Sequence, residues 1–74
     1  MYTYYCIKLV LVNGTVGYAE YGGLTSNINN AMFFDTFSEA KDWYVRNIKY
    51  TTYNGVAVDT GKCTIVSVNS NEAL

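Results

Sequence analysis

The strongest structural signal in the sequence is a helix start at Thr36. Thr36 and Glu39 have the spacing of a capping box, in which the Thr hydroxyl accepts a hydrogen bond from the Glu amide and the Glu side chain reaches back to the Thr amide. Apolar residues then recur on one helix face, and acids precede bases as the helix dipole prefers. We therefore predict a helix over 37–49, after a short strand at 31–34. Its apolar stripe consists of Phe37, Ala40, Tyr44 and Ile48, with Trp43 and Val45 beside it. The solvent face carries Glu39, Asp42, Arg46 and Lys49, and Asp42 and Arg46 have the four-residue spacing of a favourable ion pair.

The first part of the chain predicts a β-hairpin. Residues 2–12 alternate between two faces, one of which carries Leu9. Asn13-Gly14 is the strongest short hairpin signal, because both residues tolerate the positive φ of a two-residue type I′ turn. Such a turn pairs Leu9 with Tyr18. The face with Leu9 then carries Tyr5, Ile7, Leu11, Val16 and Tyr18, and the opposite face carries Gly17 and Ala19.

The rest of the chain predicts a polar loop at 24–30, strands at 56–59 and 62–68 joined by a turn at Thr60-Gly61, and a polar tail at about 69–74. Asn54-Gly55 is a further turn signal. We therefore expect one α+β domain over residues 1–74, with the element order β-β-β-α-β-β. About five strands form an antiparallel-rich sheet in this prediction, and one helix packs on one of its faces.

Composition argues against several classes of function. The chain has no His, so Ser-His and Cys-His catalytic pairs are impossible, and two Cys with scattered acids make no plausible zinc site. The net charge of −1 does not fit the basic stripe that nucleic-acid binding needs. No stretch approaches the roughly 20 apolar residues of a membrane span. We therefore expect no catalytic residue, no cofactor, no metal, no nucleic-acid partner and no membrane contact.

The two cysteines leave two interpretations open. In an intracellular protein, Cys6 and Cys63 are expected to be free, buried thiols. If they lie on adjacent strands in the middle of the sheet, they could instead form a disulfide under oxidising conditions.

Asp59-Thr60-Gly61 follows an apolar segment and resembles the active-site triplet of aspartic proteases. In that family, two such Asp share a proton and activate water. Even the small viral members need a longer chain after the triplet, whereas thirteen residues follow Gly61. Asp, Thr and Gly are also ordinary turn residues, so we interpret the triplet as a turn.

Aromatic content points to a binding surface. Eight Tyr are a large aromatic surface for one small core to hide, which suggests an interface or a homo-oligomer. The alternative is that Tyr is simply a favourable strand residue with a polar end. We place the surface on the first hairpin, the polar loop after it and one helix residue. The predicted partner-binding residues are Tyr18, Glu20, Tyr21, Leu24, Thr25, Asn27, Asn29 and Trp43.

The segments Tyr21-Gly22-Gly23-Leu24-Thr25 and 30–43, Asn-Ala-Met-Phe-Phe-Asp-Thr-Phe-Ser-Glu-Ala-Lys-Asp-Trp, resemble small, mostly uncharacterised proteins of phages and prophages from low-GC bacteria. In these, a strand ending in Phe-Asp-Thr or Phe-Asp-Ser leads into Glu-Ala-Lys and an amphipathic helix. Such proteins include anti-CRISPRs and other inhibitors of host defence, which act mostly by binding and without catalysis. The resemblance implies an inhibitor that acts in the host cytoplasm on a bacterial protein, such as a CRISPR effector.

The function expected from the sequence is thus that of a small, non-enzymatic binding protein. Two alternatives stay open. One is an oligomeric sponge that sequesters a nucleotide signal in a polar, aromatic-lined pocket. The other is a self-assembling accessory or structural phage protein.

Overall fold

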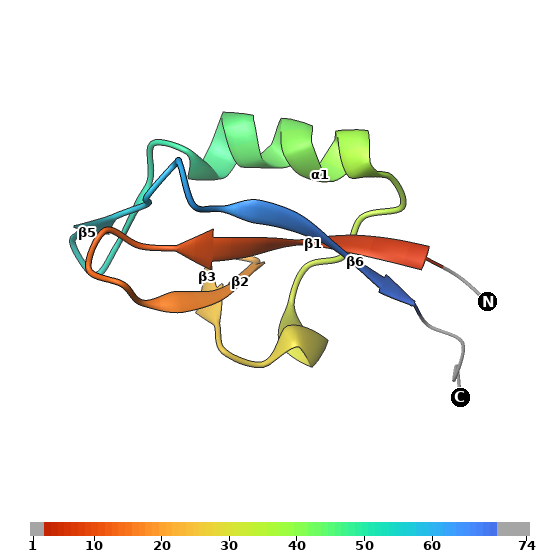
Figure 1. The fold of residues 1–74 in the computed structure, drawn as a ribbon, viewed down its shortest axis with the longest axis horizontal. Coiled ribbons are helices and arrows are strands. Elements are labelled where there is room, and N and C mark those ends of the chain that lie inside the picture. Colours follow the sequence, from red (N-terminus) through yellow and green to blue (C-terminus); the bar gives the residue numbers. More distant parts are fainter. Residues whose placement is uncertain (1–2, 70–74) are drawn as a thin grey trace.

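The computed structural model of the protein describes residues 3–69. Their main element is a four-stranded antiparallel sheet in the order β3-β2-β1-β6, and the helix α1 lies over one face of it (Figure 1). The expected α+β class, with a helix on one face of an antiparallel sheet, is confirmed. The elements are β1 (Thr3–Val10), β2 (Val16–Glu20), β3 (Gly23–Thr25), α1 (Phe37–Trp43) and β6 (Thr64–Asn69).

Four shorter elements complete the described chain. They are the 3-10 turn η1 (Ile28–Asn30), the π-helical turn η2 (Tyr44–Ile48), and the strands β4 (Thr52–Tyr53) and β5 (Val56–Ala57), which pair with each other. Three strands precede α1 and three follow it, so the predicted order lacked one strand. Of the predicted tail at 69–74, only Asn69 is described, and it ends β6. The predicted start of the first strand at residue 2 also lies outside the described residues.

The core lies between β1 and the helix. The side chains of Ile7 and Leu9 are fully buried, and Leu11 is nearly so, as the alternation along the first strand predicted. Ala40 and Ile48 meet them from the helix. Full burial of one large aliphatic side chain contributes roughly 1.5–3 kcal/mol, so these contacts stabilise the packing of the helix on the central strand.

The register of the first hairpin differs by one residue from the prediction. Leu9 pairs with Gly17, whereas a two-residue turn pairs it with Tyr18. A shift of one residue moves every side chain of a strand to the other face. The predicted inward position of Val16 and Tyr18 is therefore wrong: Gly17 and Ala19 are buried, and Val16 is 51% exposed.

Two local features explain this register. The connection is a longer loop, closed by a hydrogen bond from Leu11 N–H to Thr15 O (2.8 Å) and containing Gly14 at φ 92°. This corresponds to the hairpin loop in which a type I turn is followed by a left-handed residue. In addition, β3 packs so closely on Gly17 that an added Cβ would lie 2.9 Å from Leu24 Cγ. Only glycine at this position lets the third strand approach.

The predicted polar loop at 24–30 is wrong, because the chain forms two short elements there. Gly22, at φ 75°, turns the chain back so that β3 pairs with β2. The 3-10 turn η1 follows, and its first turn is capped by the Asn27 side chain, whose Oδ1 accepts from Asn29 N–H at 3.0 Å. Polar side chains here satisfy backbone groups, which explains the absence of any hydrophobic period.

The predicted strand at 31–34 is reduced to a single bridge. Tyr5 and Phe34 exchange backbone hydrogen bonds of 2.8 and 2.7 Å. Two residues earlier, Met32 N–H donates to Ala19 O at 2.9 Å, so the segment contacts β2 first and β1 second. A segment that crosses from one strand to the next cannot form a ladder with either of them.

The predicted hairpin around Thr60-Gly61 is also wrong. The hairpin forms at Asn54-Gly55, between β4 and β5, where both residues have the positive φ (53° and 81°) of a type I′ turn. β6 pairs instead with β1, from Thr3 opposite Asn69 onward. This pairing packs Ile65 against the core. A hairpin between the neighbouring segments 56–59 and 62–68 would lack that contact.

The helix begins as predicted. Thr36 Oγ1 accepts a hydrogen bond from Glu39 N–H at 3.1 Å. In the described part of the chain, the Thr36 N–H donates no hydrogen bond to the Glu39 carboxylate, so one half of the capping box forms. The helix then widens into η2, where Lys49 N–H donates to Tyr44 O, five residues back, at 2.9 Å. Within residues 3–69, no helix is both long and apolar enough to span a membrane.

Candidate functional site: an acidic and aromatic groove beside the helix

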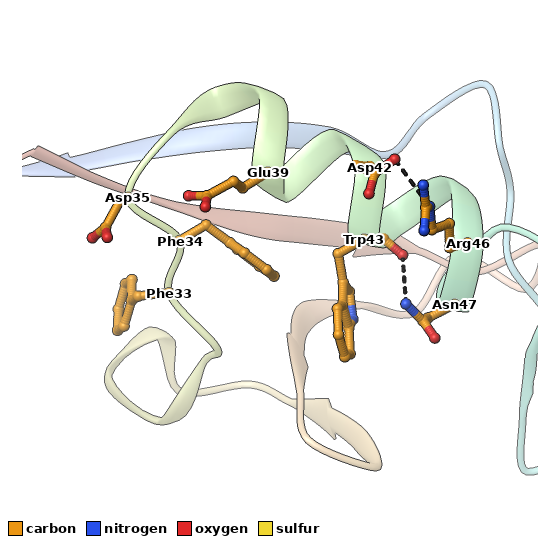
Figure 2. A pocket seen from close by; sticks show the side chains of 8 residues that line it. All are labelled: Phe33, Phe34, Asp35, Glu39, Asp42, Trp43, Arg46 and Asn47. Atoms are coloured by element: carbon orange, nitrogen blue, oxygen red, sulfur yellow. Dashed lines mark hydrogen bonds and ion pairs between the residues drawn. The ribbon is translucent and has the colours of Figure 1, made fainter.

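A groove of about 630 Å³ runs between the helix and the segment that leads into it (Figure 2). Aromatic rings, carboxylates, one guanidinium group and one amide line it, and we call it the acidic–aromatic groove. Its lining residues are Phe33, Phe34, Asp35, Glu39, Asp42, Trp43, Arg46 and Asn47.

Side chains at helical spacing form one wall of this groove. Glu39, Asp42 and Arg46 are three and four residues apart, which places them in a row on one side of the helix. Asn47 Nδ2 donates to the carbonyl of Trp43 at 3.3 Å, and this bond holds the amide at one end of the row (Figure 2).

The other wall is the segment that crosses from β2 to β1. Its bridge to Tyr5 fixes the backbone of Phe34. The Phe34 ring lies 6.1 Å from the Trp43 ring, at an interplanar angle of 47°, and Tyr21 meets Trp43 edge-on at 6.3 Å. The Phe33 side chain is 40% exposed at the rim. The groove therefore presents aromatic surface to solvent from a fixed backbone.

Negative charge collects at the groove. Three of the six acidic residues of the chain line it, although the net charge of the protein is only −1. Asp42 is paired with Arg46, whose Nε lies 3.1 Å from Asp42 Oδ1. Asp35 and Glu39 form no ion pair with any other described residue. Two carboxylates thus remain without a cation at the end of the groove away from Arg46 (Figure 2).

The structure brings only part of the predicted binding set to this groove. Trp43 lines it and Tyr21 touches the Trp43 ring. Tyr18 pairs with Lys8 in the sheet, and Leu24 packs against the core. Glu20 lies in β2, opposite Gly23 of β3.

The other predicted residues form a polar turn of their own. Asn27 N–H donates to Thr25 Oγ1 at 3.1 Å, and Asn29 N–H donates to Asn27 Oδ1. The Thr25 and Asn27 side chains thus accept from backbone amides of the same turn, and none of these residues lines the groove.

Most of the groove was not among the sequence predictions. The residues missed are Phe33, Phe34, Asp35, Glu39, Asp42, Arg46 and Asn47. The helical row was predicted as a solvent face, and 33–34 as an ordinary strand. The sequence signal that could have identified the groove is the row of charges at helical spacing directly after two adjacent Phe.

A second, apolar groove of about 400 Å³ lies on the other side of the helix, against β6. Its lining residues are Ile7, Phe37, Lys41, Tyr44, Cys63, Thr64 and Ile65. The Tyr44 hydroxyl is buried there and has no hydrogen-bond partner in the described chain. Burial, and secondarily the neighbouring Cys63, raises the pKa of Tyr44 to about 12. None of the residues that line this groove is a carboxylate or a His.

Neither cysteine is in a disulfide. Cys6 is fully buried and lies opposite Val66, and burial raises the pKa of its thiol. Cys63 Sγ lies 3.3 Å from Asp59 O and 3.4 Å from Val10 N. Each thiol therefore has a local structural environment of its own.

The Asp59-Thr60-Gly61 triplet forms a turn. Gly61 N–H donates to Asp59 Oδ1 at 3.2 Å, and Lys62 N–H donates to Asp59 O at 3.0 Å. The carboxylate is thus used in its own turn. Across residues 3–69, no three His, Cys, Asp or Glu side chains lie close enough together to hold a metal ion.

No protein-family model matches the chain, and no curated protein or solved structure matches it either. The geometry of the two grooves is therefore the basis for any inference about function.

Proposed function

We propose that this is a non-enzymatic binding protein that contacts a partner protein through the acidic–aromatic groove. The exposed Phe33 ring at the rim and the half-buried Trp43 ring in the wall share this groove with Asp35 and Glu39, which form no ion pair with any other described residue. Aromatic side chains are the residues that protein interfaces enrich and that most often dominate their binding energy. The same residues account for a contact surface without invoking any catalytic group.

A nucleotide is a poorer ligand for this groove than a protein. Its aromatic rings could stack on a base, but Asp35 and Glu39 would face the phosphates. Like charges at short range oppose binding. The arrangement therefore favours a protein partner over the nucleotide that a sponge would take.

The resemblance to phage and prophage proteins supports a bacterial target, and we include in the proposal that the chain inhibits a host defence system in the host cytoplasm. Effectors that bind nucleic acid, CRISPR effectors among them, need basic surfaces to contact phosphates. An acidic groove is complementary to such a surface. A plasmid-interference assay in bacteria that express the chain tests this target: restored plasmid uptake supports it, and unchanged interference contradicts it.

Site-specific photocrosslinking tests the contact surface itself. A benzoylphenylalanine at Phe33, on the groove rim, is compared with one at Phe37, on the other side of the helix. The two Phe side chains are 40% and 49% exposed, so they form a matched pair. In bacterial lysate we expect one dominant crosslinked protein from position 33 and none from position 37. Equal crosslinking from both positions would contradict the proposal. So would the absence of crosslinking from both positions, if a nucleotide at the same time raises the thermal unfolding midpoint of the protein.

A further inference from the structure

The end of the groove that holds Asp35 and Glu39 has the chemistry of a cation site. Both carboxylates are exposed and neither has a cationic partner in the described chain. Glu39 accepts no hydrogen bond from the Thr36 amide, so its carboxylate is not used in the helix cap. These two groups are available to a ligand.

Aromatic surface lies directly beside the carboxylates. Phe34 stands between Asp35 and Trp43 along the groove (Figure 2), and its ring is 6.1 Å from that of Trp43. The face of an aromatic ring attracts a cation, most strongly for Trp. A cationic ligand therefore gains from the carboxylates and from the rings, whereas a purely apolar ligand gains from the rings alone and an anion is repelled by the carboxylates.

The groove already contains one pair of a guanidinium group with a carboxylate. At the end away from Asp35, Arg46 Nε lies 3.1 Å from Asp42 Oδ1. A guanidinium group is planar, donates to carboxylates in a fork and stacks on aromatic faces, while an ammonium group does only part of this. The chemistry of the groove thus suits a second arginine better than a lysine.

We propose that the groove binds an arginine side chain of the partner, with its guanidinium between the carboxylates of Asp35 and Glu39 and the rings of Phe34 and Trp43. This rests on the proposed function and specifies the partner as a basic segment of a protein. The charge of the groove, opposite to that of the ligand, selects this occupant.

Trp43 provides the readout, since it is the one Trp in the sequence. The probe is acetyl-tetra-arginine amide, titrated into the protein while the Trp43 emission is followed. The same peptide with citrulline, which has a neutral urea in place of the guanidinium, is the matched control, and tetra-lysine is the second cation. We expect saturable binding of the arginine peptide, weaker binding of the lysine peptide and no response to citrulline. Added salt should weaken the arginine response, because the pairs are exposed.

Variants locate the site. Asp35→Asn and Glu39→Gln are each expected to weaken arginine binding by up to about fivefold, the range of an exposed ion pair. Glu20→Gln removes the same charge from a residue that does not line the groove, and it should leave the affinity unchanged. Phe34→Leu should also weaken binding of the arginine peptide. The citrulline peptide should still cause no change in the Trp43 emission of this variant. Circular dichroism and thermal unfolding confirm that each variant is folded.

Two outcomes overturn the inference. One is a citrulline peptide that binds as well as the arginine peptide. The other is a Glu20→Gln variant that loses as much affinity as Glu39→Gln, which would show attraction by net charge alone. If the arginine peptide does not bind but crosslinking from position 33 still captures a partner, the arginine site is wrong and the binding surface stands. If both experiments fail, the proposed function is wrong as well.

Discussion

The thiol of Cys63 fills a break in the hydrogen bonding of the central strand. Val10 N–H points to Cys63 Sγ, with the nitrogen and sulfur 3.4 Å apart, while Val10 O accepts from Asp59 N–H at 2.8 Å. On one side of the break Lys8 pairs with Thr64, and on the other side Leu11 pairs with Val58. The turn between these two pairings removes the backbone acceptor that Val10 N–H would otherwise use.

Replacing this thiol should destabilise the protein. In Cys63→Ala, the half-buried Val10 N–H loses its acceptor, which costs about 1–3 kcal/mol in the free energy of unfolding. Cys63→Ser keeps an acceptor of similar size and should lose less. Urea denaturation measures both variants, and an alanine variant as stable as the parent chain would show that solvent satisfies Val10.

Gly17→Ala should lower stability because of the close approach of β3. The added Cβ would lie 2.9 Å from both Leu24 Cγ and Thr25 O, so the strand has to move. Overpacking of this kind costs about 1–3 kcal/mol. Gly61→Ala is the control, since its Cβ would lie 3.7 Å from Asp59 Oδ1, at ordinary contact distance. Equal unfolding midpoints for the two variants would disprove the packing explanation.

Thr36→Ala should remove the helix cap. The Glu39 amide then loses the acceptor that it has in Thr36 Oγ1, and loss of an N-cap typically costs about 1 kcal/mol. Ser38→Ala, two residues later on the exposed side of the helix, should change the thermal midpoint little. If the two alanine variants unfold at the same temperature, the cap contributes nothing to stability.

The buried hydroxyl of Tyr44 should make stability fall at high pH. Burial raises its pKa to about 12 in the folded protein, against about 10 in the unfolded chain. Its contribution is complete below pH 10 and is lost as the pH rises toward 12, because the unfolded chain releases its proton first. Burial also raises the pKa of Tyr53, so the comparison must be made between variants.

Tyr44→Phe isolates this effect. It deletes the hydroxyl that has no hydrogen-bond partner in the described chain. Urea midpoints of the variant should fall less between pH 10 and 12 than those of the parent chain, with little change at neutral pH. A parallel fall in the two proteins would mean that other groups cause the pH dependence.

Features set by neighbouring residues were predictable. The cap at Thr36, the Asp42–Arg46 pair and the inward row of Ile7 and Leu9 all follow from spacings of two to four residues, and the structure contains each of them. The turn signal at Asn54-Gly55 belongs to this group, since positive φ is a property of the two residues themselves.

Features that depend on distant partners were not predictable. The register of β2 depends on Leu24 packing on Gly17, and the pairing of β6 depends on a strand more than fifty residues earlier in the sequence. Local turn propensity favoured other solutions in both places. Burial outweighed it, because a pairing that buries Ala19, or that packs Ile65 against the core, gains more than a preferred turn.

The same division applies to the function. The sequence by itself determined one capped helix on an antiparallel sheet and a composition poor in catalytic groups, because these depend on residue type and local spacing. Only the tertiary structure decided that the Phe33–Asp35 segment lies along the charged side of the helix, since the bridge between Tyr5 and Phe34 holds it there. The groove exists because a segment that crosses from β2 to β1 is held by backbone hydrogen bonds to both strands, forms a ladder with neither, and leaves a space beside the helix.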